Sequence, residues 1–493
     1  MTGQDQWTAV GQLPETEVSR PRAPVVLTRL VWLLFAGSLA ALGLRLATGW
    51  GPELPGVAVD GLTVLMWTVV SFLSGIVHSY SRRYMAGERG EAAFFRRVFG
   101  FTLAVMVLVV ADHVVLFLAA WLAMGLVMAR LIAHGGWPQA RAAGRMALRY
   151  FLASSALLAG ALGALWWTTG AATVSGMVAT AGSLPKVVWL AAAGALVLAA
   201  MVQSALVPFH GWLLGSMTAP TPASALMHVG FVNAGGILLV RFAPVVSIDA
   251  RVLLAVAVLG AASALLGKLL KSVQPDIKRQ LGCSTVGQMG FMILQAGLGF
   301  FGAAVTHLVL HGFYKAYQFL ASGAAVEHTS PGAEAEPGRA GPLGLLATGV
   351  TALAGGALFA VLTGKGTSLD SGLLLTVLVV LTTLHAARGA VRRADLPTAV
   401  RYGAVPLVFL PAIALYAGVY EAVTALLAGL PLVTAPAALT PVHVLLTGAF
   451  LLAYVAIESG AYQHSDRLYA ALVAATEPPA NTLLIATEEY REQ

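Results

Sequence analysis

The sequence predicts an all-α protein that crosses a membrane many times, and two observations carry that prediction. Of its 493 residues, 58% are hydrophobic and only 10% are charged, whereas a soluble domain carries about 25% charged residues. Apolar stretches near twenty residues long recur along the chain, and each can cross a hydrocarbon core of roughly 30 Å as a helix. Such helices satisfy their backbone polar groups internally, as lipid demands. The short alternating segments of an outer-membrane barrel are absent from the sequence.

About fourteen spans can be placed along the chain, within a predicted architecture of 13–14 helices. They lie near residues 25–47, 57–80, 95–111, 113–133, 147–169, 187–206, 221–243, 252–271, 283–300, 302–326, 342–363, 371–387, 402–428 and 440–458. Positive charge tests this count, because Lys and Arg mark the cytoplasmic loops of membrane proteins. Most basic residues follow the second, fourth, eighth and twelfth spans, and the exceptions are Lys186, Arg241, Arg251 and Lys365. The pattern predicts that both termini are cytoplasmic.

The polar stretches predict tails and a loop instead of soluble domains. Residues 1–24 are expected to form a cytoplasmic tail, because no short apolar core precedes a small-residue cleavage site. The transmembrane domain is expected over 25–458, with a Pro- and Gly-rich surface loop at 327–341, and a second cytoplasmic tail over 459–493. The single cysteine, Cys283, excludes an internal disulfide or a Cys-based metal cluster within one chain.

The densest cluster of ionisable residues within an apolar span is His307, His311 and Lys315. An ionisable side chain at the bilayer centre costs at least ~2.5 kcal/mol on insertion scales, so it requires a reason. The i, i+4, i+8 spacing places all three on one helix face, as a ladder with steps of roughly 6 Å. Imidazole and a buried amine can both titrate near neutral pH, which favours a proton relay. The alternative is that the histidines are packing residues and Lys315 snorkels to a surface.

A second feature is a helix interruption rich in proline. Pro208, Pro220 and Pro222 break the apolar region over 205–235, because proline cannot donate the helical hydrogen bond. Broken helices at membrane depth are tolerated where they are buried in protein or line a polar cavity. His228 lies about two turns beyond Pro222 and is expected to link the break to the ladder. The alternative is a re-entrant loop between two ordinary helices.

Two further ionisable residues are weaker candidates for ion translocation. Lys268 lies seven residues before Pro275, close enough to the helix end for a lysine to snorkel as an alternative to a buried role. Asp112 begins the fourth span and is either a helix N-cap or an acid near the ion entrance.

Three long segments resemble the antiporter-like subunits of respiratory complex I and of Mrp-type cation antiporters. They are PFHGWLLGSMTAPTPASALMH, VQPDIKRQLGCSTVGQMGFM and HLVLHGFYKAYQFLASG, and the resemblance covers roughly residues 55–330. It implies two inverted five-helix repeats with broken helices and a central polar axis that carries protons. On that axis the family's histidines fall on His228, His307 and His311, and its basic residue falls on Lys315.

The sequence departs from that family at two positions. Leu122 follows Trp121 where the family has a glutamate, and Gln203 begins QSALVP where the family has a lysine. The usual Glu–Lys pair of the first half-channel is therefore missing. Lys268 is a candidate replacement for that lysine in the first half.

These losses, together with NAGGILLVRF and LYAALVAATEPPANTLLI, resemble the DabB family, the membrane subunits of inorganic-carbon accumulation systems. That resemblance implies a bacterial inner-membrane location and a soluble DabA-like partner on the cytoplasmic face. The partner would carry Zn²⁺ in a site like that of a carbonic anhydrase, and no cofactor or metal is expected in this chain. H⁺ or Na⁺ flow would then energise CO₂ hydration in the partner, so this chain would not itself be an enzyme. A proton-translocating subunit of a complex I-like or Mrp-type machine, or a structural anchor with a vestigial channel, remain the alternatives.

Overall fold

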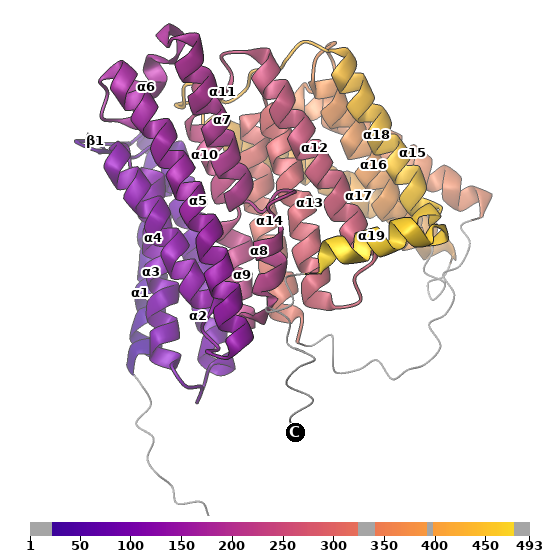
Figure 1. Ribbon diagram of the computed structural model, residues 1–493. Coiled ribbons are helices and arrows are strands. Elements are labelled where there is room, and N and C mark those ends of the chain that lie inside the picture. Colours follow the sequence, from indigo (N-terminus) through magenta and orange to yellow (C-terminus); the bar gives the residue numbers. More distant parts are fainter. Residues whose placement is uncertain (1–21, 324–340, 392–397, 478–493) are drawn as a thin grey trace, which may run out of the picture.

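The computed structural model describes residues 22–323, 341–391 and 398–477, and these form an upright bundle of helices (Figure 1). The first part of the bundle consists of α1 (Arg22–Thr48), β1 (Glu53–Leu54), β2 (Val57–Ala58), α2 (Gly61–Tyr84), α3 (Glu91–Val110), α4 (Val114–Ile132), α5 (Pro138–Thr169), α6 (Val174–Ala179), η1 (Ala181–Ser183), α7 (Lys186–Gln203), α8 (Gly211–Gly215), η2 (Ser216–Thr218), α9 (Thr221–Leu226), the π-helix η3 (Met227–Phe231), α10 (Ala234–Arg241) and α11 (Ala243–Val246). The second part consists of α12 (Ala250–Ser272), α13 (Ile277–Gly297), α14 (Phe301–Ala321), α15 (Pro342–Thr363), α16 (Gly372–Val391), α17 (Thr398–Leu426), α18 (Pro441–Glu458), η5 (Ala461–His464) and α19 (Asp466–Thr476).

Each of the fourteen predicted spans corresponds to helix in the described residues, which confirms the all-α polytopic prediction. Twelve helical segments in the part of the chain that the structure describes are long and apolar enough to cross a membrane. α13 and α14 complete the fourteen at 21 residues each. They fall outside the apolar set because they carry many polar residues, the His–Lys ladder among them. The two helices that look least like membrane spans are thus the ones that hold the candidate site.

Acidic residues at the membrane ends begin three of the helices. Asp60, Asp249 and Asp276 are the N-caps of α2, α12 and α13, and each side chain accepts a hydrogen bond from a backbone N–H in the first turn at 2.8–2.9 Å. A carboxylate there satisfies a donor that the helix cannot. These acids therefore mark helix starts.

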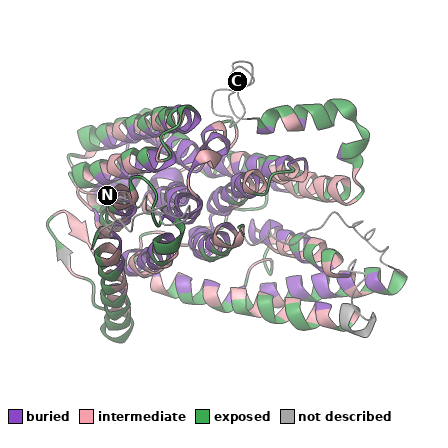
Figure 2. Ribbon diagram, turned by 90° about the horizontal axis from the view of Figure 1, so that it is seen from below, coloured by how far each residue is buried: buried purple, intermediate pink, exposed green. Residues whose placement is uncertain are grey.

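Burial follows a centre-to-rim gradient, with buried residues gathered in the middle of the bundle and exposed residues on its outer helices (Figure 2). The apolar window of the segment Thr221–Arg241, which contains His228, is entirely buried, whereas only 17% of the apolar window of α1 and 6% of that of α18 are buried. The exposed side chains of the rim are largely apolar, as in Leu33, Leu353 and Leu407. Such a surface suits lipid, and the polar ladder lies behind it.

α12 and α13 pack against each other without side chains between them. A methyl group added at Gly260 or Gly267 of α12 would overlap the backbone of α13, and one added at Gly290 of α13 would overlap the backbone of α12. Small residues allow this close approach, which is how membrane helices associate without a hydrophobic driving force. The contact fixes the register between Lys268 on α12 and the helix that precedes the ladder.

The predicted interruption is present between α7 and α9. α7 ends at Gln203, and Ala205 adopts a left-handed φ of 54° before the chain reaches Pro208. Side chains from other helices satisfy the freed backbone groups: Ser204 Oγ donates to the Val232 carbonyl at 2.6 Å, and Val207 N donates to Ser263 Oγ at 3.2 Å. The start of the break, from Ser204 to Leu206, is buried in protein, whereas Pro208 is exposed.

Part of the predicted C-terminal tail is helical and docks on the bundle. α19 lies across the upright helices (Figure 1). The carbonyl of Ala475 lies 3.2 Å from His210 Nε2 in the break, and Thr476 is hydrogen-bonded to Gln274. Most of the predicted loop at 327–341, and residues 1–21 of the predicted N-terminal tail, lie outside the described residues.

Two of the basic residues that break the charge pattern are neutralised or shielded by the fold. Arg241 at the end of α10 forms an ion pair with Asp60 and also donates to Thr63 Oγ1 at 3.1 Å and to the Val109 carbonyl at 2.6 Å. Burial alone would raise the pKa of the Asp60 carboxyl, but the Arg241 guanidinium outweighs it and holds that pKa below its ordinary value. Lys365 lies over the rings of Phe300 and Tyr420, 4.9 and 5.6 Å from their centroids, a cation–π arrangement.

Candidate ion-translocation site

α14 places the predicted ladder in the interior of the bundle. The rings of His307 and His311 are nearly parallel, at an interplanar angle of 15°, with their centroids 5.8 Å apart. That separation matches one turn of helix between positions i and i+4. Lys315 continues the same face one turn further along. The structure therefore brings the three predicted residues together as one column.

Lys315 does not snorkel to a surface, because its side chain has no solvent-exposed area. Its Nζ donates a hydrogen bond to the carbonyl of Leu281 at 3.1 Å. Across the described part of the chain, no carboxylate lies within ion-pair distance of this ammonium. A lysine held in such surroundings is costly when charged. It is therefore suited to exchanging its proton, which is the property a relay needs.

His228 meets the ladder from the broken helix. It lies in the π-helix η3, is fully buried, and its ring stacks on Phe319 of α14 with centroids 4.3 Å apart and an interplanar angle of 17°. π-turns are rare and often mark functional positions. The structure thus places His228 against the helix that carries His311 and Lys315.

Several buried polar atoms around the ladder lack a protein partner. Both ring nitrogens of His228 and of His311 have no hydrogen-bond partner in the protein, and neither do Nε2 of His307 and Oδ1 of Asn233. Buried polar groups in proteins are hydrogen-bonded to protein or to ordered water, and buried water usually bridges such groups. These unpartnered acceptors and donors are concentrated along the ladder and beside His228.

A cavity of about 260 Å³ adjoins the ladder at His307. Its walls come from α13, α14, α15, α16 and α17, and its polar lining includes Gln295, Thr382, Thr383 and Tyr416. A space of this size holds several water molecules. The cavity therefore lies between His307 on α14 and the helices of the second part of the bundle.

Two family models match this chain. The model described as "NADH:quinone oxidoreductase/Mrp antiporter, TM" matches residues 111–336, and the model described as "NADH-Ubiquinone oxidoreductase (complex I), chain 5 N-terminus" matches residues 55–95. The matched regions contain the break and the ladder, and together they cover just over half of the chain. The chain belongs to the antiporter-like family of complex I and Mrp subunits.

The similar curated proteins include probable inorganic carbon transporter subunits and a complex I subunit. The chain is 40% identical over 291 residues to a probable inorganic carbon transporter subunit DabB1 of Halothiobacillus neapolitanus, which is 57% of this chain and 51% of that protein. It is 37% identical over 316 residues to a probable DabB of Bacillus subtilis, which is 62% of this chain and 61% of that protein. It is also 36% identical over 277 residues to the NADH-quinone oxidoreductase subunit L of Mycobacterium tuberculosis, which is 55% of this chain and 43% of that protein. The matches thus span about half the length of these relatives.

Solved structures share the fold of this antiporter-like subunit. The Mrp complex of Dietzia sp. aligns with a TM-score of 0.57 at 22% identity, over 92% of this chain and 50% of that one. An archaeal membrane-bound sulfane sulfur reductase aligns with a TM-score of 0.58 at 16% identity, over 95% and 96% of the two chains. The antiporter-like fold, with the length and composition of its helices, establishes an integral membrane protein.

The first half of this antiporter-like subunit lacks ionisable residues at the two positions noted in the sequence. Gln203 at the end of α7 is fully buried, and neither atom of its amide group has a protein partner. Trp121 donates from Nε1 to Ser154 Oγ at 3.3 Å, and the neighbouring Leu122 is only partly exposed. The amide of Gln203 can hydrogen-bond water but cannot exchange a charge as a lysine can.

His78 of α2 is a polar residue of the interior that the sequence analysis did not identify. It is fully buried, and its Nδ1 lies 2.8 Å from the Ser74 carbonyl and 3.2 Å from Ser74 Oγ, which in turn lies 2.6 Å from Thr102 Oγ1. Its Nε2 has no partner. α2 packs against α9 and α14. A histidine in the middle of an apolar span was the signal that could have revealed it.

The structure gives each of the two weaker candidates a partner from another part of the chain. The Nζ of Lys268 lies 2.9 Å from His385 Nε2 on α16. Asp112 is partly exposed at a membrane end, where it accepts hydrogen bonds from the backbone N and the Oγ of Ser175, at 2.8 and 2.7 Å. It anchors the start of α6, while His113 caps α4.

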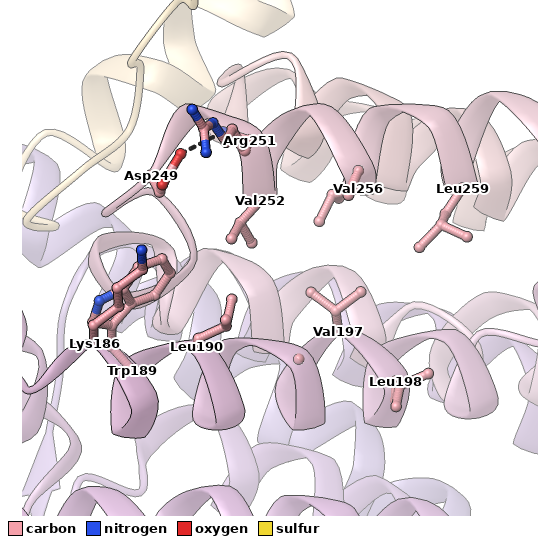
Figure 3. A pocket seen from close by; sticks show the side chains of 12 residues that line it. Lys186, Trp189, Leu190, Val197, Leu198, Asp249, Arg251, Val252, Val256 and Leu259 are labelled. Carbon is pink, nitrogen blue, oxygen red and sulfur yellow. Dashed lines mark hydrogen bonds between the residues drawn. The ribbon is translucent and has the colours of Figure 1, made fainter.

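An open groove between α7 and α12 is unrelated to the ladder. Figure 3 shows its apolar walls, with Leu190 and Val197 facing Val252 and Val256, and its charged end at Lys186, Asp249 and Arg251. The groove has a volume of about 530 Å³, but none of the relay residues lines it.

The described residues contain no group of three or more His, Cys, Asp or Glu side chains arranged to hold a metal ion. Cys283 is buried and unpaired. The chemistry available in the interior is thus proton exchange and hydrogen bonding by imidazole, amine and amide groups.

Proposed function

We propose that this chain conducts protons, or Na⁺, across the membrane and couples the ion gradient to inorganic carbon accumulation by a soluble partner. The observation that carries the proposal is the fully buried Lys315 at the end of a column of histidines with unpartnered ring nitrogens. No structural role requires three such groups on one face of a buried helix. The similarity to probable inorganic carbon transporter subunits supports the carbon-related part of the proposal.

In this proposal protons pass along His307, His311 and Lys315, with His228 joining the path at the broken helix. Water bridges the gaps, because the two imidazole rings are 5.8 Å apart by their centroids and direct hydrogen bonds need donor–acceptor distances near 3 Å. Gln203 orders water in the first half, where the lysine of the family is missing. Asp112 has a structural role at the start of α6.

The partner would be a DabA-like protein with a zinc site of the carbonic anhydrase type, bound on the cytoplasmic face of a bacterial inner membrane. The charge pattern supports cytoplasmic termini, since most basic residues follow even-numbered spans. A unit charge that crosses 100 mV carries about 2.3 kcal/mol. If each hydration event were coupled to one such charge, its equilibrium would be biased by roughly forty-fold, at 1.4 kcal/mol per decade.

The test is inorganic-carbon-dependent growth of a host that lacks carbonic anhydrase and expresses this chain with its candidate zinc partner. The wild-type pair should rescue growth in air, and the Lys315→Ala variant or an uncoupler should abolish that rescue. Thr306→Val is a matched control, because Thr306 is a buried polar residue of the same helix whose hydroxyl bonds only the Gly302 carbonyl. Rescue by the partner alone, or by the Lys315→Ala pair, would refute the proposal.

The second candidate is a proton-translocating subunit of a complex I-like or Mrp-type cation/proton antiporter. The match of both family models favours it, whereas Leu122 and Gln203 count against it because those machines depend on the Glu–Lys pair. Expression in a sodium-sensitive host that lacks its own antiporters distinguishes the two functions. Sodium resistance without the zinc partner would favour the antiporter.

A further inference from the structure

Three ionisable side chains meet in a cluster that lies outside the ladder. His385 of α16 is at its centre: its Nε2 lies 2.9 Å from Nζ of Lys268 on α12, and its Nδ1 lies 2.6 Å from Oε1 of Glu458 on α18. A neutral imidazole has one donor and one acceptor nitrogen. The geometry therefore gives Nδ1–H donating to the carboxylate and Nε2 accepting from the amine.

Further groups surround the carboxylate of Glu458. Arg388, one turn beyond His385 on α16, places its guanidinium 3.5 Å from Oε2 of Glu458 and donates to the hydroxyl of Tyr454 at 3.2 Å. Lys271 is the nearest other charge on α12 that acts on Lys268. The side chain of Glu458 is 9% exposed, whereas that of His385 is 41% exposed. The cluster thus joins a buried carboxylate to a surface through one imidazole.

The cluster lies toward one membrane side. Lys268, His385 and Glu458 are all in the C-terminal halves of their helices, and these helices are the eighth, twelfth and fourteenth spans. Even-numbered spans run in the same direction, and the positive residues that follow them predict a cytoplasmic end. The ladder also runs toward that side, from His307 to Lys315, but Lys315 has no exposed surface there. The ladder therefore needs another connection to water.

The cavity beside His307 supplies that connection. Thr382 and Thr383 of α16 line it, and His385 follows Thr382 by three residues. Positions i and i+3 share a helix face and are separated by ~4.5 Å along the axis. The cavity thus has His307 on one wall and Thr382, three residues before His385, on another.

We propose that Lys268, His385 and Glu458 form the cytoplasmic proton port of this protein, which exchanges protons with the ladder through the cavity between α13 and α17. The proposal rests on the proposed function, and it assigns the exchange with bulk water to residues of the second half. Arg388 is a positioning residue that holds the Glu458 carboxylate.

The proton step within the port is balanced. An N–H bond of the Lys268 ammonium breaks as an Nε2–H bond of His385 forms, and the Nδ1–H proton of His385 passes to Oε1 of Glu458. One proton has then moved from the amine to the carboxylate, and the imidazole is left as its other tautomer. Water in the cavity reprotonates Lys268, and water at the membrane surface takes the proton from Glu458. His385, which is 41% exposed, returns to its first tautomer by losing the Nε2 proton to water and gaining one at Nδ1. The reverse sequence carries a proton from water at the surface to the cavity.

The first test is proton flux into proteoliposomes that hold the purified full chain, an entrapped pH dye and a potassium-valinomycin potential. His385→Gln and Glu458→Gln should each lower the flux at least ten-fold, and the double variant should be no slower than the slower single variant, because the two residues act in series. His464→Gln and Glu477→Gln are matched controls at exposed positions and should retain the wild-type flux. The port would be refuted if both port variants kept a flux within two-fold of wild type while Lys315→Ala abolished it. That outcome would leave the proposed function intact.

A second measurement tests the port independently of flux. Absence of flux in the wild-type chain would count against the proposed function but would leave this second test usable. Infrared pH titration of the chain in nanodiscs should show a carboxyl C=O band that disappears in Glu458→Gln. Its midpoint should move in His385→Gln and in Lys268→Met, because these side chains contact one another. A band that is absent, or a midpoint that neither variant moves, shows that the three groups do not exchange protons.

Discussion

Lys315 provides the sharpest test of the relay, because its replacement should remove function while increasing stability. Methionine has a similar length and no charge, so Lys315→Met keeps the packing against α13. A charge in the bilayer interior costs at least about 2.5 kcal/mol on insertion scales, and the lost hydrogen bond from the charged Nζ to the Leu281 carbonyl contributes about 2 kcal/mol. The variant should therefore be more stable than wild type by at least ~0.5 kcal/mol, the difference between these two values.

The assay pairs unfolding in a denaturing detergent with proton flux into proteoliposomes. Flux should fall at least a hundred-fold while the unfolding midpoint rises. Leu308→Ala is the informative contrast on the same helix, because Leu308 is buried and apolar. Its truncation should cost 2–5 kcal/mol, as for other buried leucines, with little loss of flux per folded molecule. A Lys315→Met protein that is destabilised by more than 2 kcal/mol, or that still conducts, would refute the reasoning.

Three further predictions concern the scaffold. Gly290→Leu should prevent α12 and α13 from packing and abolish accumulation of folded protein in the membrane. Gly37→Leu, at a position with open space around it, should not. Gel filtration of the two variants in detergent compares their amounts of folded protein. The pKa of Asp60 is lowered in the folded protein, so its ion pair with Arg241 should stabilise the fold above the ordinary carboxyl pKa of about 3.9 and lose that effect as pH falls below it. In unfolding titrations, Asp60→Asn should therefore be less stable than wild type at pH 6 and approach wild-type stability at pH 3. An equal difference in stability at both pH values would contradict this. Asp112→Asn should cost about 1 kcal/mol through loss of a helix-start contact without lowering proton flux, and a large flux loss at unchanged stability would return Asp112 to the ion path.

The ladder could be predicted from the sequence because it depends only on helix geometry. His307, His311 and Lys315 are separated by four residues each, so any helix over that segment places them in one column. The break was equally local, because the backbone chemistry of Pro208 and Pro220 prevents a continuous helix. The column and the helix break could therefore be predicted from residue spacing and residue type alone.

The environment of Lys268 could not be predicted in the same way. Its partner His385 lies 117 residues away in the sequence, and no periodicity within α12 indicates which later helix packs beside it. The expectation that Lys268 replaces the missing lysine of the first half gave no indication of this partner. His385 is a single histidine within α16, and Glu458 is the last residue of α18. Only the packing of α12, α16 and α18 brings the three together.

The glycine contact between α12 and α13 has a mechanical consequence. At Gly260, Gly267 and Gly290 the two backbones are in contact, so α12 and α13 cannot move closer together without collision. Lys268 is attached to α12, and the Leu281 carbonyl that accepts from Lys315 belongs to α13. The glycine contact therefore sets how closely the helix of Lys268 approaches the helix that holds the end of the ladder.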